Sequence, residues 1–211
     1  MGGDTLDISV RLDAKSHALI TMPGASKFYR SSGPQACLNQ HFYLDDGSTL
    51  EWLPQDTILF PGANAALRSV FHLKASSTLL AWELYCLGRP VIGETFSHGT
   101  LESRLEVWVD DEPRLIERQH LSDGDLAPVD GHPWLGTLLF YPAGETHLDT
   151  VRERLAPLGN YAGATLTDDL LSVRFLSHDN LICQRVMRDI WQSLRPLLTP
   201  KNACSPRIWQ T

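Results

Sequence analysis

Residues 6–12, Leu-Asp-Ile-Ser-Val-Arg-Leu, alternate strictly between apolar and polar side chains. A period of two places the apolar side chains on one face of an extended strand and the polar ones on the other. A similar alternation returns in residues 67–73 and 105–109. The turn at 110–113, Asp-Asp-Glu-Pro, then leads into a further strand at 115–116. These segments predict strands that each bury one face.

Further candidate strands follow at roughly ten-residue spacing and are separated by Gly, Asp and Pro. They span residues 17–22, 36–44, 48–53, 79–87, 134–141, 161–166 and 169–176. Short strands in this arrangement predict a mainly β fold with mostly antiparallel strands. Two packed or wrapped sheets would bury their many apolar faces.

Two segments near the C-terminal end have a helical period instead. Residues 145–158 and 179–197 place leucine, isoleucine and valine three and four positions apart. Gly159 closes the first segment, and Pro200 follows the second. No repeat, low-complexity tract or linker divides the chain, so we expect residues 1–211 to form a single domain.

The composition excludes several classes of function. The chain has 211 residues, of which 43% are hydrophobic and 20% charged, and its net charge is −7. Binding to a nucleic-acid backbone requires a basic stripe, so we expect no nucleic-acid partner. No apolar run approaches the ~20 residues of a membrane helix, and no signal peptide is evident. The four cysteines form no C-x-x-C pair and suit reduced thiols, so we expect a cytoplasmic protein with no membrane partner.

Catalytic and chelating motifs are absent from the sequence. The eight histidines form no H-x-H, H-x-x-x-H or H-E-x-x-H spacing. The chain also lacks a G-x-S-x-G nucleophile motif and a phosphate-binding loop. We therefore expect no catalytic residue and no tightly bound cofactor. Among the histidines, His98 follows a turn-rich stretch and is kept as a candidate polar group.

Three carboxylates lie in settings that call for an explanation. Glu83 and Glu117 interrupt apolar runs, where an unpaired buried carboxylate would cost several kcal/mol. Asp4 follows two glycines, in a turn that lets its side chain approach neighbouring backbone. For Glu83 the alternatives are an outward orientation, an ion pair with a cation such as Arg89 or Arg104, or a place in a hydrated internal passage.

Two short blocks mix aromatic and charged side chains. Residues 27–30 are Lys-Phe-Tyr-Arg, and residues 50–58 are Leu-Glu-Trp-Leu-Pro-Gln-Asp-Thr-Ile. Each block is either part of the core or a docking surface, because Trp and Arg concentrate at the centres of interfaces. The candidate docking residues in these blocks are Lys27, Phe28, Tyr29, Arg30, Trp52 and Asp56.

The ending at 206–209, Pro-Arg-Ile-Trp, is too apolar for a free tail. We expect Trp209 to pack on the body of the protein or on a partner. We expect Arg207 to pair with a carboxylate there, and both residues are further docking candidates.

The blocks at 25–31 and 50–58 occur in order with Trp82-Glu83, with 86–90 (Cys-Leu-Gly-Arg-Pro) and with the ending at 206–209. Together they resemble the UreD (UreH) family of urease accessory proteins, over the whole chain. The resemblance implies a β-helix-like array of strands plus two helices. It also implies a shortened start, because family members carry a further segment before the Gly-Gly-Asp turn. Loss of strands there would expose a sheet edge.

The resemblance implies a non-enzymatic urease maturation factor. Such proteins bind apo-urease, through its structural subunits, on one side and UreF on another, and the GTPase UreG is recruited through UreF. Nickel would pass from UreG through UreF and the UreD-like protein to apo-urease.

A transit path requires weak oxygen ligands, because a closed His/Cys site would trap Ni²⁺. We therefore expect Asp4, Glu83 and Glu117 to contact nickel in transit, with Ser26 and His98 as polar lining.

Two alternatives stay open. A structural clamp would hold urease without touching nickel and would tolerate replacement of these carboxylates by amides. A β-fold metal-dependent enzyme would use His98, Glu83 and Glu117, and would hold metal tightly and stoichiometrically.

Overall fold

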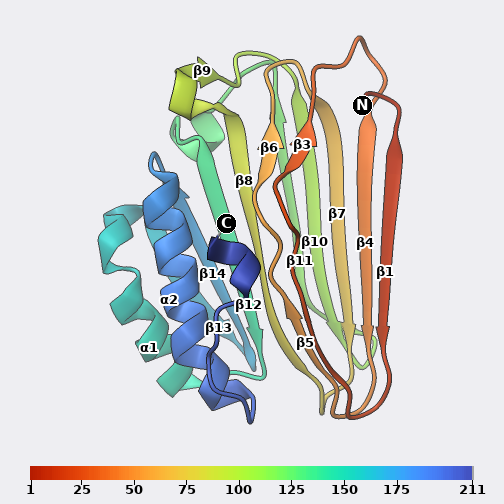
Figure 1. The fold of residues 1–211 in the computed structure, drawn as a ribbon, viewed down its shortest axis with the longest axis vertical. Coiled ribbons are helices and arrows are strands. Elements are labelled where there is room, and N and C mark those ends of the chain that lie inside the picture. Colours follow the sequence, from red (N-terminus) through yellow and green to blue (C-terminus); the bar gives the residue numbers. More distant parts are fainter. Residues whose placement is uncertain (211) are drawn as a thin grey trace.

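The computed structural model describes residues 1–210, in which two β-sheets pack face to face and helices cover the outer face of one of them (Figure 1). Sheet A contains, in spatial order, β1 (Thr5–Leu12), β4 (Ala36–Leu44), β7 (Asn64–Leu73), β10 (Thr100–Val109) and β11 (Glu112–Ser122). Sheet B contains β13 (Ala162–Thr167), β14 (Leu170–Ser177), β12 (Trp134–Tyr141), β8 (Thr78–Arg89), β5 (Thr49–Trp52) and β2 (His17–Ile20). Three short strands extend sheet B, namely β3 (Ser26–Phe28), β6 (Thr57–Leu59) and β9 (Glu94–Thr95).

The chain winds around the two sheets, and this confirms the β-helix-like array. It alternates between sheet A and sheet B as it passes through β1, β2, β4, β5, β7 and β8. Successive windings therefore lie parallel, as in the pairs β1–β4, β4–β7, β7–β10, β2–β5 and β5–β8. The pairs β3–β6 and β6–β8 are parallel as well.

Strand direction is the part of the fold prediction that was wrong. Among the strand pairs within residues 1–210, those that are antiparallel are β10–β11, β8–β12, β12–β14, β13–β14 and β8–β9. Turn spacing in the sequence does not distinguish a hairpin from a crossover to a second sheet. A chain that crosses over after each strand returns to the first sheet in the same direction, which makes the pairs parallel.

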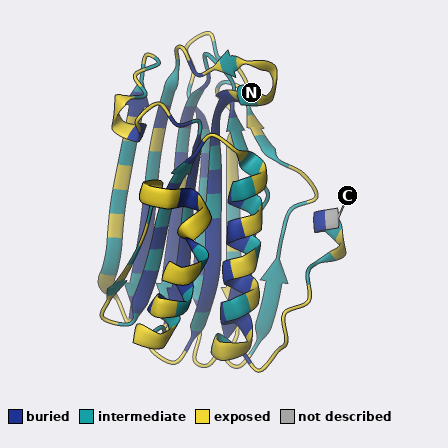
Figure 2. Cartoon of the chain, turned by 90° about the vertical axis from the view of Figure 1, so that its left-hand side faces the viewer, coloured by how far each residue is buried: buried dark blue, intermediate teal, exposed yellow. Residues whose placement is uncertain are grey.

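The two predicted helices are confirmed, and both lie on the outer face of sheet B. They are α1 (Glu145–Arg154) and α2 (Asn180–Leu198), and their buried residues face the sheet (Figure 2). Asp179 caps α2 by accepting the backbone N–H groups of Leu181 at 2.7 Å and Ile182 at 3.3 Å. No helix in the described part of the chain is long and apolar enough to cross a membrane. The short 3₁₀ turns are η1 (Pro90–Ile92), η2 (Ala127–Val129), η3 (Ala156–Tyr161) and η4 (Arg207–Gln210).

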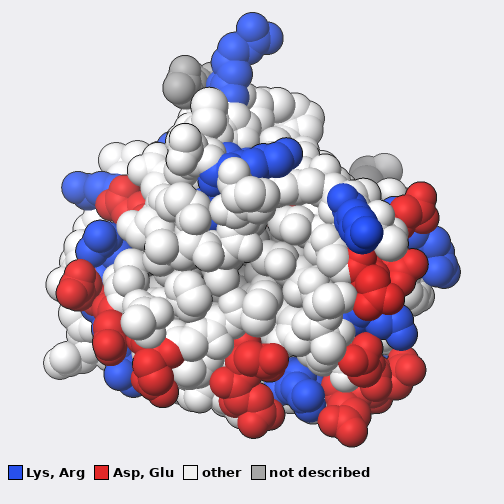
Figure 3. Space-filling model, turned by 90° about the horizontal axis from the view of Figure 1, so that it is seen from below, with Lys and Arg blue, Asp and Glu red and all other residues white. Residues whose placement is uncertain are grey.

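The turns at the lower end of the sandwich carry many carboxylates (Figure 3). Asp110, Asp111 and Asp168 have φ values of 47°, 66° and 53°, in the left-handed region that aspartate tolerates better than most residues. The other acidic residues of these turns and of the adjoining strand start are Asp13, Asp45, Asp46, Glu112 and Asp169. This end of the molecule is therefore mainly acidic.

Apolar side chains form three clusters. One lies between sheet B and the helices and includes Trp82, Phe140, Ile190 and Trp191. The other two lie between the sheets. The lower cluster includes Phe42, Trp52, Phe71 and Val107, and the upper cluster includes Leu38, Leu59, Leu87 and Leu101. Strands β8 and β12 contribute to both faces of sheet B, which explains their nearly continuous apolar sequences.

Candidate functional site

A layer of polar side chains separates the upper and lower clusters between the sheets. On sheet A, the register aligns Gln40, Ser69, Leu105 and Glu117 on neighbouring strands. On sheet B, it aligns Glu83, Thr137 and Arg174. Successive side chains of a strand point to opposite faces, so the residues that flank Glu83 and Arg174 in sequence face the helices. The polar residues of this layer therefore face the opposite sheet.

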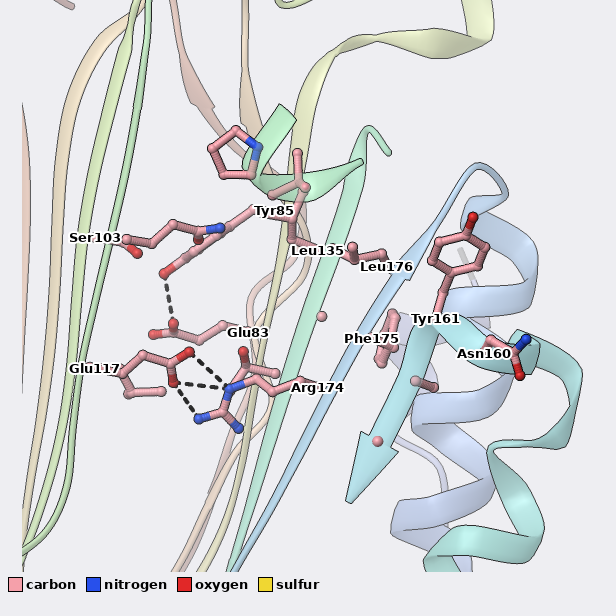
Figure 4. A pocket seen from close by; sticks show the side chains of 18 residues that line it. Glu83, Tyr85, Ser103, Glu117, Leu135, Asn160, Tyr161, Arg174, Phe175 and Leu176 are labelled. Atoms are coloured by element: carbon pink, nitrogen blue, oxygen red, sulfur yellow. Dashed lines mark hydrogen bonds and ion pairs between the residues drawn. The ribbon is translucent and has the colours of Figure 1, made fainter. Parts of the chain in front are cut away.

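A cavity of about 420 Å³ opens in this layer, where β11 faces β13 and β14. Both Glu83 and Glu117 line it, together with Tyr85, Ser103 and Arg174 (Figure 4). The sequence singled out the two glutamates separately, and the structure brings them into one cavity. This cavity is the candidate functional site.

Glu117 and Arg174 join the two sheets at the solvent side of the cavity. Arg174 Nε donates to Glu117 Oε1 at 3.1 Å and to Oε2 at 2.9 Å, and Nη2 also donates to Oε2. This two-point contact is the favoured geometry of an arginine–carboxylate pair. The Arg174 side chain is 32% exposed and that of Glu117 is 42% exposed. Because solvent screens such a pair, it contributes at most about 1 kcal/mol to stability.

Glu83 lies deeper and is held by hydroxyl groups. Ser69 Oγ donates to Glu83 Oε1, and the Tyr85 hydroxyl donates to Oε2 at 2.6 Å. Gln40 Nε2 donates to Ser69 Oγ at 3.1 Å, which extends the polar contacts to β4. Burial raises the pKa of Glu83, against the opposing effects of both hydroxyls and the Arg174 charge. The pKa shift therefore favours the protonated form of Glu83.

Asp4 and Ser26 lie elsewhere. They line a second hollow of about 540 Å³, where β1 and β4 face β3. The Asp4 carboxylate is exposed and pairs with the N-terminal ammonium group of Met1. Because β1 and β11 are the two edges of sheet A, the predicted nickel-contacting residues fall into two groups at opposite edges of the sandwich.

His98 belongs to neither group. It is exposed on the segment between β9 and β10, and its Nδ1 lies 3.1 Å from Ser97 Oγ. It does not line the cavity that contains Glu83 and Glu117. Within residues 1–210, no group of three His, Cys, Asp or Glu side chains is arranged to hold a metal ion. The structure thus does not assemble the His98–Glu83–Glu117 site that a metal-dependent enzyme would use.

The block at 27–30 is partly on the surface. Lys27 and Arg30 are exposed, and Tyr29 is 50% exposed and packs against Phe60, with ring centroids 4.7 Å apart. Phe28 packs against the upper cluster. This block therefore presents two cations and one aromatic ring to solvent.

Trp52 and Asp56 have structural contacts instead. Trp52 is 1% exposed, and its ring lies 4.8 Å from that of Phe42, so the core interpretation holds and no side-chain surface remains for docking.

The half-buried Asp56 carboxylate accepts Asn180 Nδ2 at 3.3 Å and Gln184 Nε2 at 3.4 Å. Burial raises the pKa of Asp56. Asp56 thereby connects the segment before β6 to the first turns of α2.

The C-terminal segment packs back on the body. Trp209 is 8% exposed, with ring centroids 5.3 Å from Trp82 and 5.2 Å from Trp191. Its Nε1 donates to Thr21 Oγ1 at 3.1 Å. Arg207 is exposed, and the ion pair expected for it is not found within residues 1–210. The prediction is therefore confirmed for the packing of Trp209 alone.

A buried cluster around Glu51 was missed by the sequence interpretation. Glu51 is fully buried and accepts Arg195 Nε and Nη2, Trp191 Nε1 and His17 Nε2, at 2.8–3.1 Å. Burial alone would raise the pKa of Glu51, but the bonds from Arg195, His17 and Trp191 together lower it. Two signals in the sequence pointed to this cluster. Glu51 lies inside an apolar run, and Arg195 lies inside the apolar stripe of α2.

Comparison with known proteins gives one consistent result. The family model described as UreD urease accessory protein matches residues 1–210. The chain is 74% identical over 211 residues to the urease accessory protein UreD of Enterobacter sp. (strain 638), covering 100% of this chain and 77% of that protein. It is 67% identical to UreD of Klebsiella aerogenes, covering 100% of this chain and 78% of the relative. It is 52% identical to UreD of Pseudomonas putida (strain GB-1), covering 100% and 76% of the two chains.

Proposed function

The chain belongs to the UreD family of urease accessory proteins and so takes part in urease maturation, and we propose that it does so as a non-enzymatic scaffold that passes nickel through the cavity between its sheets. Nickel is the cargo of this passage and not a resident cofactor. The observation that carries the proposal is the convergence of Glu83 and Glu117, from opposite sheets, on one cavity.

The donor set suits a cation in transit. The cavity offers carboxylate and hydroxyl oxygens from Glu83, Glu117, Tyr85 and Ser103. Ni²⁺ is a borderline cation that accepts oxygen ligands and water, although nitrogen and sulfur ligands hold it more tightly. Oxygen ligands at separate positions allow exchange with water and release to the next site. The contacts from Glu83 through Ser69 reach Gln40 on β4, and other residues of β4 line the hollow that holds Asp4 and Ser26.

Partner docking is the second part of the proposal. UreF, with UreG recruited through it, and the structural subunits of urease would bind different surfaces. The exposed side chains of Lys27, Tyr29 and Arg30 support one docking surface. The acidic turns at the lower end support a second surface for a basic partner (Figure 3). A cytoplasmic location belongs to this proposal, because all four cysteines are free thiols.

The test replaces Glu83 by glutamine, which keeps the shape of the side chain and removes its charge. The variant is co-expressed with UreF, UreG and apo-urease at limiting nickel. We expect the partner complex to form normally on size exclusion, while the nickel content and activity of urease fall. The matched control is Glu153→Gln on the exposed face of α1, outside the cavity and outside both proposed docking surfaces, which should activate urease as the wild type does.

A structural clamp gives the opposite result. Glu117 is already paired with Arg174, as a purely structural carboxylate would be. If urease acquires its full nickel content with Glu83→Gln, the passage is wrong and the clamp is the better description.

A further inference from the structure

We infer that Arg174 determines whether the cavity accepts a metal cation: its guanidinium occupies the position beside Glu117 and Glu83 that a divalent cation would take. The inference rests on the proposed nickel passage and names the residue that regulates it. Figure 4 shows Arg174 extending from β14 into the cavity and meeting Glu117, with Glu83 beside the pair.

The order of the groups along the cavity supports this role. Glu117 and Arg174 are 42% and 32% exposed and lie at the solvent side. Glu83 lies behind them and is held by Ser69 and Tyr85. A cation that enters from this side meets the ion pair before it meets Glu83.

The charges show what the ion pair does. Arginine stays protonated in proteins, so the positive charge of Arg174 cannot be removed by titration. While the guanidinium remains in place, its charge neutralises that of Glu117 and lies close enough to affect the charge of Glu83. The same positive charge repels any incoming cation. The guanidinium has to move away before the two carboxylates can bind a divalent cation together. Because both side chains of the pair are partly exposed, a partner docked at the β11 edge can reach them.

The test measures binding of NiCl₂ to the purified full chain by equilibrium dialysis in metal-free buffer. Arg174→Met keeps the length of the side chain and removes its charge, and Arg174→Lys keeps the charge. We expect Arg174→Met to bind Ni²⁺ at least about tenfold more tightly than the wild type, because it leaves two carboxylates without a competing cation. Arg174→Lys should bind as weakly as the wild type. The double variant Arg174→Met/Glu83→Gln should lose the gain.

Two further variants keep the test decisive. Arg118→Met removes an exposed arginine of β11 that lies outside the cavity, and it should leave nickel affinity unchanged. Arg174→Gln is neutral and still offers Glu117 a hydrogen-bond donor, so it replaces Arg174→Met if circular dichroism shows that the methionine variant is unfolded. Wild-type nickel affinity in the folded neutral variant would overturn the inference, as would a gain that persists in the double variant.

Failure of this inference differs from failure of the proposed function. If neutral Arg174 variants bind nickel no better while Glu83→Gln still abolishes urease activation, Arg174 has no regulatory role and the passage stands. If Glu83→Gln activates urease normally, the passage itself is wrong.

Discussion

Glu51 and Arg195 form a two-point ion pair between β5 and α2, although they are 144 residues apart in sequence. Their side chains are 0% and 9% exposed. Trp191 and His17 donate to the same carboxylate, each at 2.8 Å. The cluster therefore connects sheet B to the helix that covers it, in the interior of the protein.

Replacing Glu51 by glutamine should destabilise the protein strongly. The change leaves the Arg195 guanidinium buried without a counter-charge, and breaking a buried pair in this way costs about 3–5 kcal/mol. Urea unfolding followed by circular dichroism gives the free energy of unfolding. Glu112→Gln, at the exposed start of β11, should stay within about 0.5 kcal/mol of the wild type. Equal stability of the two variants would show that the buried pair is not needed.

The same carboxylate should make the protein sensitive to acid. Its folded pKa lies below the ordinary value of 4.5, so its stabilising effect is present above pH 4.5 and is lost as the pH falls through the folded pKa. The difference in unfolding free energy between the wild type and Glu51→Gln should therefore shrink in that range. A difference that does not change with pH would contradict the assigned direction of the shift.

Glu83 should have the opposite effect on stability. Its folded pKa is raised, so between pH 4.5 and the folded pKa the unfolded chain releases a proton that the folded protein keeps. Stability from this group is complete below pH 4.5 and declines as the pH rises through the folded pKa, by at most about 1.4 kcal/mol per pH unit. The unfolding free energy of the wild type relative to that of Glu83→Gln should therefore decline across this range. Parallel pH profiles of the two proteins would contradict it.

Replacing the three proposed nickel contacts together should stop nickel delivery. In the triple variant Asp4→Asn/Glu83→Gln/Glu117→Gln, the cavity and the second hollow both lose their carboxylates, while the shapes of the side chains are kept. We expect the complex with UreF and apo-urease to form, and urease nickel content at limiting nickel to fall. Metal analysis of purified urease is the measurement. Unchanged nickel content would favour the structural clamp.

Removing the C-terminal tryptophan should weaken the fold or abolish soluble expression. Trp209 contacts Trp82, Trp191 and Arg188, and replacing a buried tryptophan by alanine costs about 3–5 kcal/mol. Trp209→Ala should lower the free energy of unfolding by an amount in that range, and deletion of 206–211 should have at least the same effect. Arg207→Ala is the control and should stay within about 0.5 kcal/mol of the wild type, because Arg207 is exposed. A soluble deletion variant that still assembles with its partners would show that this segment is dispensable.

The sequence by itself determined where most strands and both helices lie, and which carboxylates interrupt apolar runs. Alternation along β1 and the helical period of α2 depend on residues a few positions apart, so they are visible in the chain. The apolar run around Glu83 is equally local, and a carboxylate inside such a run needs a partner or water. The family blocks are local patterns too, and they identified the family before any contact was known.

Only the tertiary structure decided which groups meet. Arg89 and Arg104, the partners considered for Glu83, pair with Glu94 and Glu106 instead.

The actual partner of Glu117 is Arg174, 57 residues away on the other sheet. That contact depends on the winding of the chain and on the register of both sheets, which no short window of sequence contains. The same reason explains the parallel strands and the buried position of Trp52. The relative direction of strands and the burial of side chains depend on how strands distant in sequence pack together. The periodicity of a strand shows only which of its side chains share a face.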